Sequence, residues 1–243
     1  MAAPGNPMSG EFRFRDRPTQ EFKDPNLNPY LKLHREFGPP VLTAQGAQKH
    51  AGQWETAFGR TAPLHLEIGT GNGFFLAEMA QRHPEWNWLG LEIRYKRVIL
   101  TAKKLQAAGA DAHTRVARYD AHCIDDLFAQ GEISAVYVNH PDPWPKDRHA
   151  DNRLFNAAFF ERIAHALKPG GEFRLKTDHR LHVESVSELT EHGPWEPLGR
   201  SDHIARDGAP WEQDVTTNYQ RKFNEKALPV YALWLRRSPD TSS

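Results

Sequence analysis

Three acidic residues follow short apolar runs of the kind that form β-strands. Glu67 comes just before a loop with glycines at 69, 71 and 73, Glu92 ends a second run, and Asp120 follows a third. Glycines let a loop turn tightly and let a ligand approach the backbone closely. In nucleotide-binding α/β folds, an acid about 20 residues beyond such a loop holds ribose hydroxyls, which suits Glu92. Asp120 is placed to accept a hydrogen bond from an adenine amino group.

The spacing of the glycines argues against a diphosphate ligand. Phe74 stands where the dinucleotide-binding pattern has its third glycine, and no Lys-Ser or Lys-Thr pair follows as in a P-loop. Three carboxylates would also repel phosphates, whereas they suit S-adenosylmethionine, which carries a sulfonium and an ammonium group. We therefore predict this cofactor, bound by Glu67, Gly69, Gly71, Gly73, Glu92 and Asp120. The alternative is that the acids cap helices or end strands in solvent.

A second candidate loop runs from His140 to His149 and contains three prolines, at 141, 143 and 145. Prolines stiffen a loop, so Asp142 is expected to be held near the sulfonium. Lys146 and Arg148 are suited to binding phosphates. Trp144 either stacks on a base or packs in the interior. No third ligand stands at a useful spacing from the two histidines, so we expect no metal site.

Both loops resemble known families. The glycine loop, its acids and the turn at Leu167–Gly171 resemble the class I S-adenosylmethionine-dependent methyltransferases. The run Asp142–Lys146 resembles the Asp-Pro-Trp-Pro-Lys segment of the tRNA (guanine-N7)-methyltransferases. Similarity to that family continues at Arg148-His149, Arg153-Leu154, Lys176–Asp178 and Thr217–Phe223, and spans roughly residues 60–235.

This resemblance implies methyl transfer to N7 of a guanine in tRNA, usually the guanine of the variable loop. It implies that Glu67, Glu92, Asp120 and Asp142 contact the cofactor, and that Lys146, Asp178 and Thr217 contact the substrate. Because N7 has a lone pair and no proton, alignment and exclusion of water matter more than a general base. We expect Asp142 to be the catalytic residue, stabilising the positive charge that the methylated base acquires.

The chain departs from the family pattern at three places, one of which is His140-Pro141, where the family tends to have small or aromatic residues. Gln220 stands where the family has a glutamate, and an amide has one acceptor where a carboxylate can accept from both N1–H and the amino group of guanine. Asp151 and Asn152 replace basic residues, which predicts weaker contact with the tRNA backbone. These departures leave two alternatives open, a methyltransferase of the same fold with another RNA or small-molecule substrate, and a non-catalytic scaffold.

The elements that must hold these residues alternate along the chain, which predicts right-handed βαβ units and an α/β, Rossmann-like class I methyltransferase fold. We expect a mostly parallel, seven-stranded sheet flanked by helices, with ligands at the carboxyl ends of the strands. The domain is expected at 43–237, after an arm at 1–42 that is flexible or becomes ordered on the substrate, and before a tail at 238–243. A short helix is expected within 43–58. Strands are predicted at 64–68, 86–93, 112–117, 133–139, 173–177 and 229–235, and helices at 73–82, 95–108, 154–167 and 181–190.

Composition sets broader limits. The 243 residues include 31 Lys plus Arg and 31 Asp plus Glu, so the formal net charge is zero. This sum conceals a basic window from Arg94 to Arg118, with seven basic residues and one acid, and an acidic window from Asp178 to Asp214. The basic window is either a solvated face or a track for phosphates. The single cysteine, with no apolar run of membrane-spanning length and no signal-peptide pattern, favours the cytoplasm. Monomer and homodimer both remain open.

Overall fold

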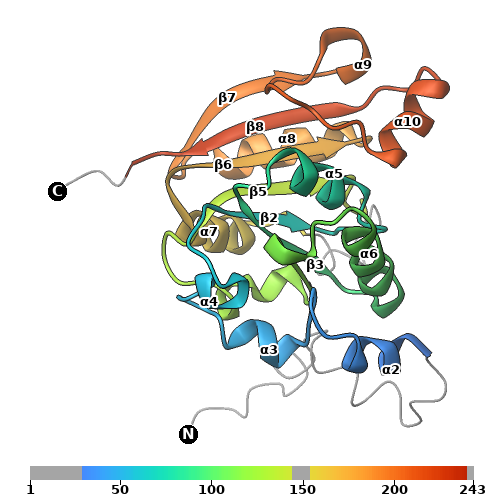
Figure 1. Ribbon diagram of the computed structural model, residues 1–243. Helices are drawn as coiled ribbons and strands as arrows, with labels where there is room; N and C mark the ends of the chain where they lie inside the picture. Colours follow the sequence, from blue (N-terminus) through green and yellow to red (C-terminus); the bar gives the residue numbers. More distant parts are fainter. Residues whose placement is uncertain (1–28, 144–153, 240–243) are drawn as a thin grey trace, which may run out of the picture.

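A sheet of eight strands runs through the centre of the molecule, in the order β1-β4-β3-β2-β5-β6-β8-β7 (Figure 1). The computed structural model describes residues 29–143 and 154–239. Neighbouring strands from β1 to β6 are parallel, whereas β8 is antiparallel to both β6 and β7. The strands are β1 (Val41–Leu42), β2 (Leu64–Ile68), β3 (Asn87–Glu92), β4 (Thr114–Arg118), β5 (Ile133–Asn139), β6 (Leu167–Thr177), β7 (Trp195–Ser201) and β8 (Tyr231–Arg237).

The expected mostly parallel α/β fold is confirmed, but the sheet has one strand more than the seven predicted. The extra edge strand, β1, has two residues, which is too short for an alternating pattern to be read from the sequence. β7 also lacks a strand signal of its own, because its middle residues are largely exposed and its pairing with β8 shifts register between Pro197 and Gly199. Neither strand is specified by its own residues, and each depends on pairing with a strand distant in sequence, β1 with β4 and β7 with β8.

Helices cover both faces of the sheet. On one face α5 and α6 pack on β3 and β4, and on the other α7 and α8 pack on β6 and β8. Alternate residues of β5 show the two faces, since Val136 and Val138 belong to the core beneath α7 and α8, and Tyr137 to the core beneath α5. The helices are α2 (Pro29–Glu36), α3 (Ala44–Gln48), α4 (Glu55–Phe58), α5 (Phe74–Arg82), α6 (Tyr95–Ala107), α7 (Ala157–Ala166), α8 (Arg180–Thr190), α9 (Ile204–Asp207) and α10 (Asn218–Glu225), with 3-10 turns η2 (Asp111–His113) and η3 (Ala121–Asp126). Within the described residues, no helix is long and apolar enough to cross a bilayer.

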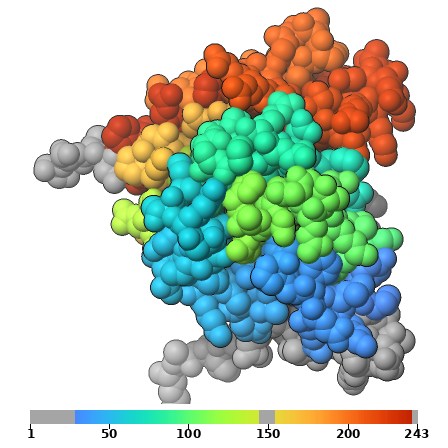
Figure 2. Space-filling view, viewed as in Figure 1, coloured from blue at the N-terminus to red at the C-terminus, as the bar shows by residue number. Residues whose placement is uncertain are grey.

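The segment before residue 43 contributes to the fold from Pro29 onward. α2 packs against α6, and Leu31 is 2% exposed. β1 pairs in parallel with β4, with Val41 opposite Val116. Figure 2 shows the blue surface of this segment continuous with the green surface of α6. Two helices, α3 and α4, stand where one was predicted within 43–58, and residues 1–28 lie outside the described residues.

The course of the chain places a crevice beside β2. From β2 the chain runs through α5 to β3 on one side, and it returns later to form β5 on the other. In open α/β sheets, ligands bind at the carboxyl ends of strands where the chain direction reverses in this way. The loops after Ile68 and Asn139 therefore face each other across the expected binding position.

Candidate functional site

A cavity of about 700 Å³ lies at the carboxyl ends of β2, β5 and β6. It is lined by the glycine loop after β2, Arg97 of α6, the Asn139–Pro143 segment after β5, Asp178 and His179 after β6, and Thr217 with one side of α10. Five segments distant in sequence thus meet at one edge of the sheet. Of the predicted site residues, Glu67, Gly69, Gly71, Asp142, Asp178 and Thr217 line this cavity.

The glycines of the loop have two different roles. Gly69 and Gly71 line the cavity with positive φ angles of 78° and 55°, and a Cβ on Gly69 would meet nothing within 4 Å. Gly73 also has a positive φ, but its Cβ would lie 2.7 Å from the Cα of Thr101 in α6. Gly73 therefore permits close packing of α5 on α6, whereas Gly69 leaves room for a ligand. The prediction of Gly73 as a cofactor contact is not supported by this geometry.

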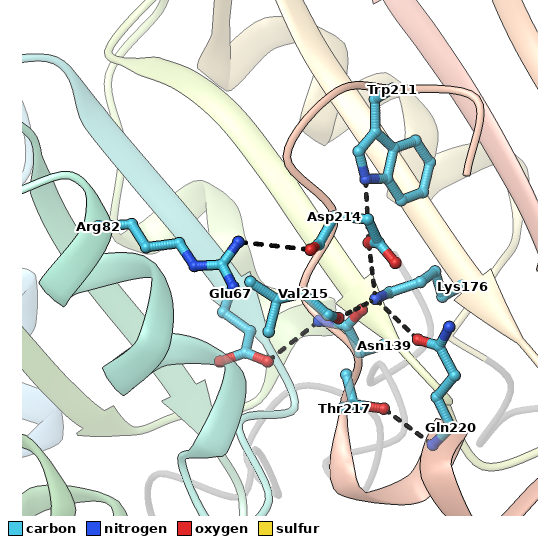
Figure 3. Close-up of polar contacts among 9 residues, drawn as sticks. All are labelled: Glu67, Arg82, Asn139, Lys176, Trp211, Asp214, Val215, Thr217 and Gln220. Atoms are coloured by element: carbon cyan, nitrogen blue, oxygen red, sulfur yellow. Dashed lines mark hydrogen bonds and ion pairs between the residues drawn. The ribbon is translucent and has the colours of Figure 1, made fainter. Parts of the chain in front are cut away.

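Glu67 is a buried acid, and one of its two side-chain oxygens has no hydrogen-bond partner among the described residues. Glu67 is the penultimate residue of β2 and is 2% exposed. Asn139 donates a hydrogen bond to Oε1 at 3.2 Å, whereas Oε2 is enclosed without a partner among the described residues (Figure 3). Burial raises the pKa of Glu67 to about 8, against the opposing effects of Asn139 and the positive charge of Lys176. A cationic ligand such as the ammonium group of S-adenosylmethionine fits this carboxylate.

Glu92 and Asp120 lie at the same edge of the sheet but outside the lining of the cavity. Glu92 accepts hydrogen bonds from the backbone N–H groups of Gly71 and Arg94, both at 3.0 Å, and so ties the glycine loop to β3. Burial raises its pKa, although these N–H groups and nearby arginines oppose the rise. Asp120 caps η3 by accepting from the His122 N–H at 3.0 Å. Both acids thus have local structural roles, as the alternative interpretation of the sequence proposed.

Asp142 is exposed and lines the cavity between Pro141 and Pro143. It lies on the β5 side of the cavity, whereas Glu67 enters from β2. The predicted phosphate contacts Lys146 and Arg148 lie outside the described residues, as do Trp144 and the departures at 151 and 152. Within the described ranges, no group of three His, Cys, Asp or Glu side chains is arranged to hold a metal ion.

Thr217 and Asp178, two residues predicted to contact the substrate, both line the cavity. Thr217 is the N-cap of α10, and its Oγ1 accepts from the Gln220 N–H at 3.0 Å. The Asp178 side chain is 10% exposed and lies between two histidines, His140 and His179. Burial raises its pKa, but the adjacent imidazoles of His140 and His179 and a backbone N–H outweigh this, so the net pKa is lowered. Asp178 is therefore an ionised acceptor at neutral pH.

Gln220 does not line the cavity, contrary to its predicted role as a substrate contact. It is 2% exposed, and its Oε1 accepts a hydrogen bond from Lys176 Nζ at 3.2 Å (Figure 3). Lys176 also donates to Asp214 Oδ1 at 3.0 Å and to the Val215 carbonyl at 2.6 Å. The three donors of the ammonium group are thus all used inside the protein. The side chain of Gln220 therefore belongs to this internal network and not to the lining of the cavity.

Sequence reasoning missed Asp214 and Asn139 as parts of the site. Asp214 is the counter-ion of the buried Lys176 and also accepts from Trp211 Nε1 at 3.2 Å. Only its position in the acidic window marked it in the sequence. Asn139, the last residue of β5, orients Glu67 across two neighbouring strands. An amide at a strand end carries no signal by itself, so this contact required the register of β2 and β5.

The basic window contributes fewer free cations than its sequence suggests. Arg118 is 4% exposed and donates to the Ile93 carbonyl, and Arg115 donates to the carbonyls of Asp111, Thr114 and Ala57. The side chains of these two arginines are directed into the protein. The basic window extends beyond α6 into β4, and the residues of β4 are mostly buried. The exposed basic residues on or beside α6 are Arg94, Lys96, Arg97 and Lys103.

Comparisons with known proteins show which family the chain resembles in sequence. A family profile described as "Putative methyltransferase" matches residues 61–233. The tRNA (guanine-N(7)-)-methyltransferase of Levilactobacillus brevis is 36% identical over 182 residues, covering 74% of this chain and 82% of that protein. The enzyme of the same name from Streptococcus thermophilus is 34% identical, covering 83% of this chain and 91% of that protein.

Two solved structures of methyltransferases have a similar fold. The 16S rRNA methyltransferase KamB superimposes with a TM-score of 0.58 at 15% identity, covering 77% of this chain and 94% of its own. A 16S rRNA adenine methyltransferase from Catenulisporales acidiphilia, solved with SAM as its cosubstrate, gives a TM-score of 0.56 at 16% identity, covering 79% of this chain and 93% of its own. At such identities the likeness concerns the fold alone.

Proposed function

This chain belongs to the tRNA (guanine-N7)-methyltransferase family, and we propose that the cavity beside β2 and β5 is where it methylates N7 of a guanine in tRNA, with S-adenosylmethionine as the methyl donor. The observation that carries this assignment is the partnerless, buried Oε2 of Glu67, a residue that lines the same cavity as Asp142 and Asp178. A site for a cation and a site for a base thus adjoin. A cytoplasmic location belongs to the same proposal, because the substrate is tRNA.

The cofactor side is formed by residues on β2 and β3. Glu67 would accept from the ammonium group, and the open backbone at Gly69 and Gly71 leaves room for the rest of the ligand. Glu92 holds the glycine loop in place, and its remaining lone pairs suit ribose hydroxyls. Asp120 lies further along the same edge, after β4, where the adenine would lie. Bound in this way, S-adenosylmethionine supplies a methyl group activated by its sulfonium.

The acceptor side requires no proton transfer by the protein. During the reaction the bond from N7 to the methyl carbon forms as the bond from carbon to sulfur breaks, so the positive charge passes to the base. Asp142 places a carboxylate at the cavity, where it stabilises that charge and helps to align the base. Asp178 is the second carboxylate available to accept from the Watson–Crick edge of guanine. The variable-loop guanine, the usual target of the family, is the proposed base.

Methyl transfer into tRNA transcripts tests this function. We expect labelled methyl groups from S-adenosylmethionine to enter a transcript with the variable-loop guanine, and a matched transcript with adenine at that position to remain unlabelled. Asp142→Asn is expected to lower kcat about 100-fold, because it removes stabilisation of the developing charge, while binding of S-adenosylhomocysteine measured by calorimetry stays within about threefold. Full turnover by Asp142→Asn would refute the role of this carboxylate, and equal labelling of both transcripts would refute the choice of base.

A further inference from the structure

His140 has an unusual backbone conformation at the edge of the cavity. It follows the last residue of β5 with a φ of 51°, a region that few residues other than glycine and asparagine adopt readily. Its N–H donates to the Lys176 carbonyl of β6 at 2.7 Å, which extends the sheet pairing by one residue. This conformation turns the imidazole inward, where its side chain is only 5% exposed.

The imidazole of His140 faces the carboxylate of Asp178. Its Nδ1 lies 3.5 Å from Asp178 Oδ1, and the Nε2 of His179 lies 3.4 Å from Asp178 Oδ2. The two histidines differ in burial, because the His179 side chain is 43% exposed. One oxygen of Asp178 therefore faces an enclosed imidazole and the other a solvated one.

An aromatic stack holds the imidazole in this position. The ring of Tyr219 in α10 lies 4.6 Å from that of His140, and Phe223 stacks on Tyr219 at 5.1 Å. Both ring nitrogens of His140 are enclosed, and neither has a partner with good hydrogen-bond geometry among the described residues. Because Nδ1 lies 3.5 Å from Asp178 Oδ1, a small adjustment would bring the two atoms within ordinary hydrogen-bond distance.

We propose that His140 is a positioning residue that acts through Asp178, holding this carboxylate toward the Watson–Crick edge of the target guanine while the imidazole is neutral. The proposal rests on the proposed function. The role of Asp178 follows from the position of Gln220. The side-chain oxygen of Gln220 is bound to Lys176 inside the protein and is therefore not available to the base. Recognition of N1–H and the amino group then falls to a carboxylate that lines the cavity, and Asp178 lies between two imidazoles that can hold it in place.

The charge of His140 decides whether Asp178 is available. A protonated imidazole would bind one carboxylate oxygen as an ion pair and would put a cation beside a base that becomes positive during the reaction. Burial lowers the pKa of His140, Lys176 lowers it further, and Asp178 opposes both effects. The other polar groups around this position are His179, the Tyr219 hydroxyl and Asp142 on the same loop as His140. The neutral form is therefore favoured at pH 7 and lost in acid.

The pH dependence of kcat/KM for tRNA tests this inference, measured with saturating S-adenosylmethionine so that ionisation of Glu67 does not contribute. For the native chain we expect kcat/KM to fall about tenfold per pH unit below the pKa of His140. His140→Asn keeps an N–H donor near the position of Nδ1 and tolerates the positive φ, but it does not titrate. It should remove this acid limb. The matched variant His179→Asn, on the other oxygen of Asp178, should retain it.

His140→Gly separates the donor from the space that the side chain fills, because glycine accepts the backbone angle but donates nothing. At pH 7.5 we expect it to raise KM for tRNA about tenfold with a smaller change in kcat, and His140→Asn to restore most of this loss. Thermal unfolding of both variants confirms that they are folded. An acid limb that persists in His140→Asn, or equal losses in the two variants, would show that His140 only packs against Tyr219.

A measurement without substrate separates this inference from the proposed function. The pKa of His140, followed by NMR of its ring protons, should fall further in Asp178→Asn, because the neighbouring negative charge is removed. An unchanged His140 pKa in Asp178→Asn would overturn the pairing. If the native chain transferred no methyl group to tRNA, the proposed function would fail, yet this titration would still report whether His140 and Asp178 interact.

Discussion

Lys176 Nζ lies 3.0 Å from Asp214 Oδ1, and this ion pair joins the middle of the sheet to the segment that leads into α10. Lys176 is 1% exposed, whereas the Asp214 side chain retains 18% exposure. Burial lowers the pKa of Lys176, and Asp214 opposes this effect. The same ammonium group reaches Gln220, so one buried charge fixes the start of the helix that forms one wall of the cavity.

Removal of this charge should destabilise the fold. Lys176→Met leaves Asp214 without its counter-ion, and we expect a loss of about 3 kcal/mol in the free energy of unfolding, measured in urea. Adding Asp214→Asn should recover part of this loss, because the unpaired charge is then gone. Lys168→Met, at the exposed start of β6, is the control and should change stability by less than about 0.5 kcal/mol. A Lys176→Met protein as stable as the native chain would contradict this account.

Cofactor affinity should depend on pH through Glu67. Its pKa of about 8 means that the ligand-free protein holds a neutral carboxyl at pH 7. Affinity for S-adenosylmethionine, measured by calorimetry, should therefore rise about tenfold per unit from pH 6 toward pH 8. Above about pH 8 it should fall again, because the α-amino group of the ligand loses its proton. Glu67→Gln should abolish the rising limb and leave the falling one, whereas an unchanged rising limb would assign it to another group.

The same group affects stability with a defined sign. The pKa of Glu67 is higher in the folded protein than its ordinary value of 4.5, so the folded state binds the proton more tightly. Its contribution is most favourable below pH 4.5 and becomes unfavourable as pH rises through about 8. Glu67→Gln should therefore unfold at a higher temperature than the native chain at pH 9, with a smaller difference at pH 5. Equal melting temperatures at pH 9 would show that burial of this carboxylate costs little.

Two glycines of one loop should respond differently to the same substitution. Gly69→Ala introduces strain at a positive φ but meets open space, so we expect a loss of about 1 kcal/mol in stability and weaker cofactor binding. Gly73→Ala adds a clash with the backbone of Thr101 to the same strain, and we expect a loss of about 3 kcal/mol. Urea unfolding and calorimetry measure the two effects. Equal losses of stability would mean that α5 can move away from α6.

The salt dependence of tRNA binding should report which cations of the basic window face the substrate. Lys96 and Lys103 are exposed on α6, so Lys96→Ala and Lys103→Ala should each reduce the slope of log K against log salt by about 1. Lys168→Ala removes an equal charge at the exposed start of β6, at the opposite edge of the sheet from the cavity, and should leave the slope unchanged. If all three variants behaved alike, the effect would reflect net charge rather than a binding face.

Local patterns were sufficient to predict most of the framework. Apolar runs separated by helical spacings predicted β2, β3, β5 and α6 within one or two residues at each end. Strands joined by helices in this order must be parallel, so Glu67 and Asp142 were expected at one edge of the sheet before any distance was known. Similarity in sequence then indicated the chemistry of the loops, which comparison with relatives supports at the level of the family.

The directions in which side chains point were decided only by the tertiary structure. Gln220 turns toward Lys176, distant in sequence, and Arg118 turns into the fold because β4 is covered on that side. β7 forms only against β8, since its own residues carry no apolar alternation. In each case the local sequence pattern predicts, at most, a helix or strand and which of its sides is buried. The partner of a buried charge or of an edge strand, however, is a residue or strand distant in sequence. It is determined by how the whole chain packs.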